Sequence, residues 1–254
     1  MRNIEYYKDL IIELTKKDIK VRYKNSYLGY LWSLANPLCL ALIFYFIFKI
    51  ITKVQMENYT LFLISGLFVW QWISNSVLAS ANIFLSNASL IKKVKFPRNF
   101  LVLSLVLSEG FNFLVSIPVI FLFMLYYKYS ISLKVILLLP LLLFLTGILI
   151  YSLSLIIGTL NVFFRDLERI VSLLLTFIFY LTPIIYSEGY IPEKYKFILY
   201  INPFASVAML WHDLFLKAIL NFKALCFLIF YDILFYIIAT VIYKKLQDKF
   251  AELV

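Results

Sequence analysis

The sequence is short of charged residues and of cysteine. Only 15% of its 254 residues are charged, against about a quarter in a soluble globular domain, and 63% are hydrophobic. A soluble chain of this length has too little interior to bury that much apolar side chain. The two cysteines, Cys39 and Cys226, lie inside apolar runs, so we expect buried free thiols. The composition therefore indicates an integral membrane protein.

The residues from which an enzyme site could be built are also scarce. With six glycines and no Gly-x-x-x-x-Gly-Lys-Ser/Thr motif, the chain has no phosphate-binding loop for ATP. The single histidine, His212, leaves no plausible Ser-His-Asp set, and no Cys/His spacing suggests a metal site. We therefore expect no catalytic residue, metal or cofactor in this chain. The net charge of +10 forms no separate basic domain, which argues against nucleic-acid binding.

Long apolar runs are abundant. Six of them approach the roughly 20 residues that a helix needs to cross a bilayer. Their continuity favours helices over the alternating segments of a β-barrel. The runs cover residues 34–51, 61–84, 100–127, 133–160, 170–186 and 222–243. We predict an all-α integral membrane protein with six transmembrane helices, forming a single transmembrane domain over residues 1–254.

The distribution of basic residues predicts the orientation of the chain. If the N-terminus is cytoplasmic, 16 of the 24 Lys and Arg residues fall on the cytoplasmic side and eight on the other. Lys and Arg are enriched in cytoplasmic loops, so this two-to-one bias predicts that both termini are cytoplasmic.

The first 32 residues have the pattern of a surface helix. Ile4, Tyr7, Ile11 and Leu14 recur at helical spacing, with charged residues between them. We predict an amphipathic helix in residues 1–32, lying at the cytoplasmic interface before spans one to five in residues 33–186.

Residues 187–221 separate spans five and six and are too polar in their first third to span. Pro192 and Pro203 suit the first turns of two short helices, near 193–199 and 204–219. We predict a re-entrant or interfacial helical hairpin at the outer face, followed by span six and a cytoplasmic tail in residues 222–254. The alternative is one more span here, which would place the C-terminal lysines outside and violate the charge rule.

Two acidic residues lie within the predicted spans, Glu109 and Asp232. Either could serve a proton relay or contact a substrate, or it could lock helices together by hydrogen bonding. A secondary transporter would show broken spans at corresponding places in two halves, and no such repeat is present.

Aromatic residues within the spans form pairs on shared helix faces. Three such pairs are Tyr45 with Phe48, Phe68 with Trp72, and Phe177 with Tyr180. Aromatic faces can stack on the C–H faces of sugars, although helix packing and contact with lipid are the simpler explanations for each residue alone. A basic loop holds Lys92, Lys93, Lys95 and Arg98 around Val94 and Phe96, a pattern that suits docking onto a partner as well as contact with anionic lipid.

Four segments together resemble the membrane subunit of ABC transporters that export polysaccharides such as O-antigen, capsule and teichoic acid. They are DIKVRYKNSYLGYLWSLANPL (18–38), KKVKFPRNFLVLS (92–104), FFRDLERIVSLLLTFIFYLTPIIY (163–186) and YINPFASVAMLWHDLF (200–215). The resemblance is greatest to the O-antigen exporters. It implies a homodimer in the bacterial inner membrane, with two copies of a cytoplasmic ATPase subunit that carry ATP and Mg.

The resemblance also implies roles for individual residues. Docking and coupling to the ATPase would involve Lys17, Asp18, Arg22, Lys92, Lys93, Lys95, Phe96 and Arg98. A channel for lipid-linked glycan would be lined by spans one and five, with Tyr45, Phe48, Phe68, Trp72, Phe177 and Tyr180 as candidates. The outer hairpin would gate it through Pro203, Trp211 and His212, where many relatives are expected to have arginine in place of His212.

Three other functions stay open at this stage. The same scaffold could export another cargo, such as a drug or a lipid. A membrane-embedded glycan-processing enzyme would need carboxylates at the membrane surface, where Glu188 and Glu193 are the only nearby candidates on the outer side. A proton-driven transporter would depend on Glu109 and Asp232.

Overall fold

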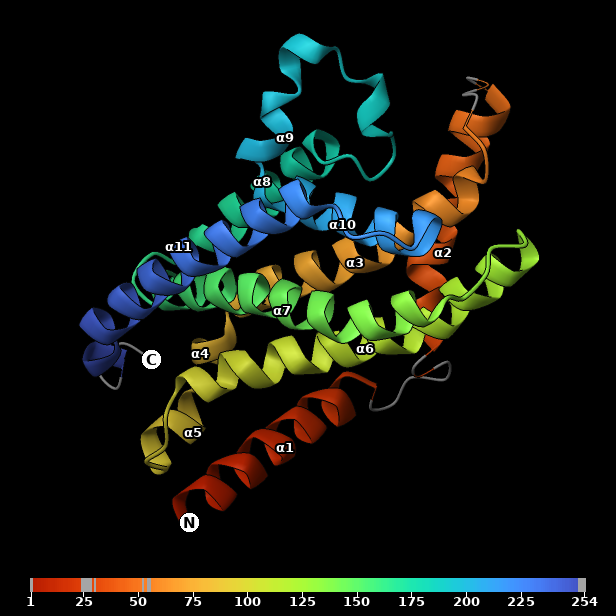
Figure 1. Cartoon of the computed structure of the whole chain (residues 1–254). Helices are drawn as coiled ribbons and strands as arrows, with labels where there is room; N and C mark the ends of the chain where they lie inside the picture. The colour runs from red at the N-terminus through yellow and green to blue at the C-terminus, as the bar shows by residue number, and fades with distance from the viewer. Residues whose placement is uncertain (1, 24–28, 30, 52, 54–55, 251–254) are drawn as a thin grey trace.

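The computed structural model of the chain describes residues 2–23, 29, 31–51, 53 and 56–250 (Figure 1). Within these ranges the regular elements are all helical and no strand is formed, so the all-α prediction is confirmed. The helices are α1 (Arg2–Tyr23), α2 (Leu31–Tyr45), α3 (Tyr59–Ser80), α4 (Ile83–Ser86), α5 (Ala88–Lys93), α6 (Asn99–Tyr126), α7 (Leu133–Asn161), α8 (Leu167–Leu181), α9 (Phe197–Ile201), α10 (Pro203–Lys217) and α11 (Phe222–Leu246). A π-helical segment, Phe46–Ile51, extends α2, and short 3₁₀ turns cover Glu188–Tyr190, Glu193–Tyr195 and Gln247–Lys249.

In the described part of the chain, five helical segments are long and apolar enough to cross a membrane. They are Leu34–Ile51, Tyr59–Ser80, Asn99–Tyr126, Leu133–Asn161 and Phe222–Lys249, close to predicted spans one, two, three, four and six. The predicted fifth span becomes α8, whose 15 residues rise only about 22 Å and fall short of a hydrocarbon core of about 30 Å. The helix ends because Thr182 is extended, as is usual for a residue that precedes proline.

The centre of the bundle is occupied by α3 and α10. In α3 the whole run from Leu61 to Trp70 is buried, and the helix contacts α2, α6, α7, α8 and α10. The residues Phe204 to Phe215 of α10 are likewise all buried, as expected of a helix that is enclosed on every side. Figure 1 shows α10 directly above α3, and α10 also contacts α7 and α11.

The segment predicted as an outer hairpin contains more elements than expected. Its second helix is α10, and Pro203 occupies the first turn as predicted. The first predicted helix, near 193–199, divides into the 3₁₀ turn Glu193–Tyr195 and the short helix α9.

The N-terminal helix α1 crosses the first turns of α6. The rings of Tyr7 and Phe100 lie 5.5 Å apart, and Ser104 Oγ donates to Asp18 Oδ2 at 2.9 Å. Between these contacts α1 advances eleven residues, about 16 Å, while α6 advances four residues, about 6 Å. The two axes therefore meet at a steep angle. Residues 24–28 and 30 of the predicted N-terminal segment lie outside the described ranges.

The prediction that the two cysteines are buried is wrong. Cys39 on α2 and Cys226 on α11 are both free and exposed on the surface of the chain. The sequence misleads here because a membrane span is apolar around its whole circumference, so an apolar neighbourhood does not reveal which face points inward.

A close approach between α7 and α3 predicts a large effect of a small substitution. A Cβ at Gly158 would lie 2.8 Å from the backbone oxygen of Ser80, whereas a Cβ at Gly147 of the same helix would meet nothing closer than 3.8 Å. We expect Gly158→Ala to destabilise the protein by about 1–3 kcal/mol, since a backbone oxygen cannot move aside. Thermal unfolding in detergent measures the effect. Gly147→Ala is the matched control and should leave stability unchanged or higher. Equal melting temperatures for the two variants would contradict this packing.

Candidate functional site

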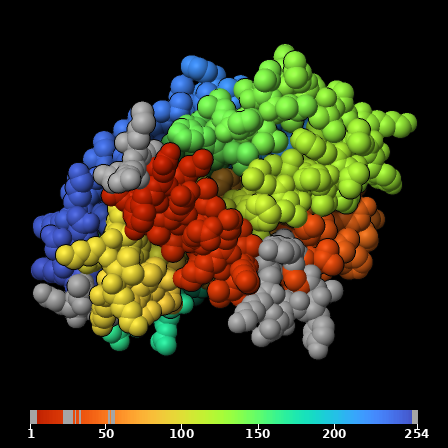
Figure 2. All heavy atoms as spheres, turned by 90° about the horizontal axis from the view of Figure 1, so that it is seen from below, coloured from red at the N-terminus to blue at the C-terminus, as the bar shows by residue number. Residues whose placement is uncertain are grey.

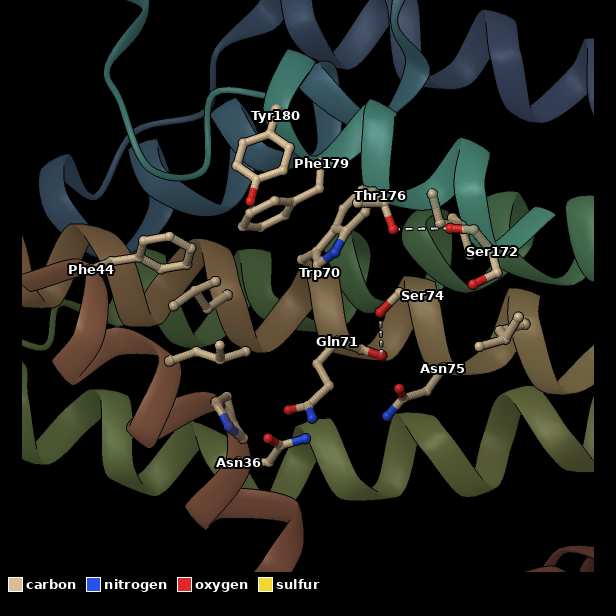
Figure 3. A pocket seen from close by; sticks show the side chains of 15 residues that line it. Asn36, Phe44, Trp70, Gln71, Ser74, Asn75, Ser172, Thr176, Phe179 and Tyr180 are labelled. Atoms are coloured by element: carbon tan, nitrogen blue, oxygen red, sulfur yellow. Dashed lines mark hydrogen bonds between the residues drawn. The ribbon is translucent and has the colours of Figure 1, made fainter. Parts of the chain in front are cut away.

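A cavity of about 470 Å³ lies between α2, α3 and α8 (Figure 3). One wall comes from α2, with Asn36, Pro37, Leu40 and Phe44; α3 contributes Leu67, Trp70, Gln71, Ser74, Asn75 and Leu78; and α8 contributes Ser172, Leu175, Thr176, Phe179 and Tyr180. In α3, Gln71 and Asn75 are four residues apart, and so are Ser172 and Thr176 in α8. Each polar pair therefore shares one helix face that looks into the cavity.

Amide and hydroxyl groups supply the polar part of the lining. Asn36, Gln71 and Asn75 each carry both a donor and an acceptor. The hydroxyl of Ser74 donates to the Gln71 carbonyl oxygen at 3.4 Å, and Thr176 Oγ1 donates to the Ser172 carbonyl oxygen at 3.0 Å. Their oxygens keep lone pairs for a ligand, because each hydroxyl proton is used by its own helix. None of the lining residues is Asp, Glu, Lys, Arg or His.

Aromatic rings gather at one end of the cavity. Phe179 lies at their centre, with ring centroids 5.9 Å from Phe44, 5.6 Å from Trp70 and 5.2 Å from Tyr180. Figure 3 shows these four rings together, with Asn36, Gln71 and Asn75 on the opposite side. The cavity thus joins an apolar stacking surface to a set of uncharged hydrogen-bonding groups.

The first turn of α8 is tied to two other helix ends. Asn82, directly before α4, donates from Nδ2 to Glu168 Oε2 at 2.7 Å, and the Glu168 backbone N–H donates to Asn161 Oδ1 at 3.2 Å. The third side is a weaker contact, with Asn161 Nδ2 donating to Asn82 Oδ1 at 3.4 Å. Asn161 is the last residue of α7 and is fully buried. We call Asn82, Asn161 and Glu168 the polar triangle.

The other end of α8 is tied to α10. Buried Thr182, which follows α8, accepts a hydrogen bond from Asn202 Nδ2 at 2.9 Å. Asn202 also caps α10, because its Oδ1 accepts from the backbone N–H of Phe204 at 3.0 Å. The helix that forms one wall of the cavity is therefore fixed at both ends by side-chain hydrogen bonds.

The basic loop after α5 has an exposed part and a buried part. Lys92, Lys93, Val94 and Lys95 are consecutive exposed residues. Phe96 packs against a small core that also contains Phe84 and Phe250. Arg98 donates to the Gln247 carbonyl oxygen and lies over the Phe250 ring, 5.9 Å from its centroid. Arg98 therefore binds the C-terminal turn of its own chain.

The predicted N-terminal coupling residues contact this region too. Lys17 Nζ donates to Asn87 Oδ1 at 2.8 Å, which joins α1 to the start of α5. Asp18 accepts from Ser104 on α6. The side chain of Arg22 lies outside the described part of the structure. Most of the predicted coupling residues thus lie around α1, α5 and the start of α6, and several of them are also used in internal contacts.

Of the six predicted channel residues, the structure places only Tyr180 in the cavity. Phe48 lies near Tyr59, with ring centroids 6.3 Å apart, and Tyr45 packs against the main core. Phe68 is buried, Phe177 is exposed on another face of α8, and Trp72 faces α6, where its Nε1 donates to the Val106 carbonyl oxygen at 3.1 Å. Sequence reasoning missed the amides and hydroxyls. Polar residues four apart inside an apolar span were the signal that could have identified them.

The predicted gate residues lie on the buried helix α10. Trp211 is fully buried and its Nε1 donates to Thr146 Oγ1 at 3.1 Å. The His212 ring packs on Phe62, with ring centroids 3.9 Å apart. It also lies so close to Gly66 that a Cβ there would be 2.6 Å from His212 Nε2. His212 is buried in this position, and burial disfavours a charged imidazole. Glu109 and Asp232 are both buried and neither lines the cavity.

Comparison of the sequence with known proteins identifies its family. A profile of the ABC-2 type transporter family matches residues 9–210. Two proteins of Klebsiella pneumoniae, each named O-antigen export system permease protein RfbA, are 47% and 46% identical over 251 residues, which is 99% of this chain and 97% of each relative. A Myxococcus xanthus protein of the same name is 29% identical over 255 residues, covering 99% of this chain and 98% of that protein. The chain therefore belongs to the ABC-2 type transporter family of membrane proteins.

Proposed function

We propose that this chain is the membrane subunit of an ATP-driven exporter that forms the channel for lipid-linked O-antigen, or a similar polysaccharide, across the bacterial inner membrane. The names of relatives that align over nearly the whole chain support the class of cargo. The observation that carries the proposal is the uncharged cavity of amides, hydroxyls and aromatic rings between α2, α3 and α8.

The chemistry of the cavity suits a polymer that must be held weakly and moved. Each sugar hydroxyl that leaves water without a new partner costs on the order of a few kcal/mol. Asn36, Gln71 and Asn75 can replace water as donors and acceptors, and the rings around Phe179 can stack on the C–H faces of sugars. Charged groups would make stronger hydrogen bonds that slow the release of each repeat. Their absence from the lining favours sliding.

A homodimer would close this cavity into a conduit. The exposed faces of α2, of the π-helical segment that extends it and of α8 carry large apolar side chains beside the polar lining, such as Leu42, Phe46, Leu173 and Phe177. Two copies related by a twofold axis would present these faces to each other. In this arrangement α8, extended by the segment after Thr182, serves as span five and brings the number of spanning segments to six. Helices α9 and α10 then form a re-entrant hairpin on the outer side. Both termini are then cytoplasmic.

The energy must come from another polypeptide, because the sequence has no phosphate-binding loop. Two cytoplasmic ATPase subunits, which carry ATP and Mg, would each dock on α1 and on the exposed basic segment from Lys92 to Lys95. Val94 adds an exposed apolar contact within this segment. Arg98 is better suited to hold the C-terminal turn in place.

The polar triangle offers a route for coupling. Asn82 lies at the start of α4, beside the segment on which the ATPase would push, and its hydrogen bond to Glu168 reaches the first turn of α8. At its other end, α8 contacts α10 through Thr182 and Asn202. A displacement of α4 and α5 would thus move the cavity wall and the hairpin together.

The cavity can be tested through its amides. Replacing Gln71 and Asn75 together with Leu should lower export of surface polysaccharide about tenfold or more, since two hydrogen bonds of roughly 0.5–1.5 kcal/mol each are lost. Surface glycan and intracellular lipid-linked glycan are measured in cells that depend on this permease, and the latter should accumulate. Thr240→Leu on α11 is the control, because that hydroxyl donates to the Tyr236 carbonyl oxygen of its own helix and lies outside the cavity. Normal export by the double variant would refute this path.

The docking surface can be tested by charge reversal. Lys92→Glu, Lys93→Glu and Lys95→Glu together should reduce co-purification of the ATPase at least about tenfold, because three favourable contacts become repulsive. Lys128→Glu, Lys134→Glu and Lys194→Glu together, at exposed positions on the outer side, control for the same change in net charge. We expect Arg98→Ala to act differently and lower thermal stability, since it removes contacts to Gln247 and Phe250. Unchanged co-purification of the triple variant would place the ATPase elsewhere.

Coupling through the polar triangle predicts an uncoupled variant. Glu168→Ala should leave the ATPase bound and hydrolysing ATP, while export falls about tenfold or more, because α8 loses its charge-assisted hydrogen bond to Asn82. The measurement is the ratio of glycan exported to ATP hydrolysed in reconstituted vesicles. Glu193→Ala is the matched control, because that carboxylate pairs with exposed Lys196 on the outer segment. A parallel loss of ATP hydrolysis and export would indicate a purely structural role for Glu168.

A further inference from the structure

A second hollow lies on the other side of α3 from the cavity. Its volume is about 660 Å³, and α6, α7 and α1 border it on the face seen in Figure 2. The indole of Trp72 forms its floor, whereas the neighbouring residues Trp70 and Gln71 of the same helix face the cavity. We call this hollow the α6–α7 groove. Because α3 separates the two sites, an occupant of the groove would not lie in the proposed path of the glycan.

The length of the groove along α6 and α7 matches the thickness of one leaflet of the bilayer. On α6 its lining residues run from Leu103 to Leu114, and on α7 from Pro140 to Tyr151. Both sets follow intervals of 3, 1, 3, 1 and 3 residues, so each is a straight stripe along one helix face. Each stripe covers eleven steps, or about 16 Å of helical rise. Half of a hydrocarbon core of about 30 Å is about 15 Å.

Two glycines keep the groove open. Gly110 on α6 and Gly147 on α7 face each other across Trp72, and a Cβ at either position would lie against the indole, at 3.2 Å and 3.8 Å respectively. Larger residues line the rim, and Leu107, Phe111 and Phe144 are exposed there. The groove therefore opens toward the medium that surrounds α6 and α7, which in a membrane is lipid.

The two ends of the groove differ in polarity. Its far end, at Leu114 and Pro140, is apolar. The near end holds the hydroxyls of Thr15, Tyr151 and Tyr236, where Tyr151 accepts a hydrogen bond from Asn99 Nδ2 at 3.1 Å. Here α1 crosses α6, and residues 15–22 of α1 contain four basic residues and one acidic residue. A ligand with one apolar chain and an anionic head fits this polarity.

We propose that the α6–α7 groove is a binding site for one acyl chain of an anionic phospholipid. The headgroup of this lipid lies against the basic residues of segment 15–22 in α1. The proposal rests on α6 and α7 spanning the membrane and on the groove's shape and charge. It is independent of the identity of the exported cargo. The bound lipid connects α1, which is part of the proposed ATPase docking surface, to the middle of the bundle at Trp72.

The test is the lipid that the protein retains. The full-length chain is reconstituted in nanodiscs of phosphatidylcholine with a minor fraction of phosphatidylglycerol, extracted into mild detergent, and examined by native mass spectrometry. We expect phosphatidylglycerol to be retained, and Gly147→Leu to reduce its retention about tenfold by filling the groove. Cys226→Leu is the matched control, because it adds a similar side chain at an exposed position of α11 and should behave as the wild type.

A second variant protects the test against misfolding of Gly147→Leu. Lys16→Glu with Lys20→Glu leaves the groove unchanged and should abolish the preference for phosphatidylglycerol over phosphatidylcholine. Equal retention of phosphatidylglycerol by Gly147→Leu and the wild type would overturn the proposal. Displacement of phosphatidylglycerol by undecaprenyl phosphate added in equal amount would also overturn it and would assign the groove to cargo lipid. Cross-linking between two copies through the rim of the groove would overturn it as well, because the groove would then be a dimer contact.

Discussion

A polar group inside hydrocarbon costs several kcal/mol unless it finds a hydrogen-bonding partner, and this cost determines how the chain is arranged. Most serines and threonines of the spans meet it by donating to a carbonyl oxygen of their own helix, as Ser80, Ser108 and Ser116 do. A side-chain amide carries two N–H donors and an acceptor, which is more than one carbonyl oxygen of its own helix can satisfy. Asn36, Gln71 and Asn75 instead face one shared cavity, where a hydrated polymer or water can be their partner. The same constraint keeps ionisable side chains out of the lining.

The consequence for movement is that α8 connects the helix ends at Asn82 and Asn161 to α10 at the other end of the cavity. It is too short to cross a membrane alone, and few of its residues are buried. Its position depends on hydrogen bonds at its two ends, to Asn82 and Asn161 on one side and to Asn202 on the other. A helix held in this way can shift as a unit when its anchors move, whereas α3 and α10 are fixed by burial along most of their length.

The sequence predicted the helical class and five of the six proposed spans, because long apolar runs are unambiguous. It also predicted Pro203 at the start of α10, since proline at a first helical turn has a local cause. It could not predict which face of a span points inward, and this is why Cys39 and Cys226 were misplaced and why Trp72 lies in the groove instead of the cavity. The polar triangle joins residues up to 86 positions apart, and no local pattern identifies such a contact.

The central claim is that glycan passes along the face shared by α2, α3 and α8, and the most direct measurement is site-specific photo-cross-linking in exporting cells. A photoreactive residue is placed singly at Asn75, at Thr176, or at Ile237 on the exposed side of α11. The account predicts cross-linked polysaccharide at Asn75 and Thr176 when the ATPase is active, and none at Ile237. Cross-links at Ile237 with none at the two cavity positions would contradict it.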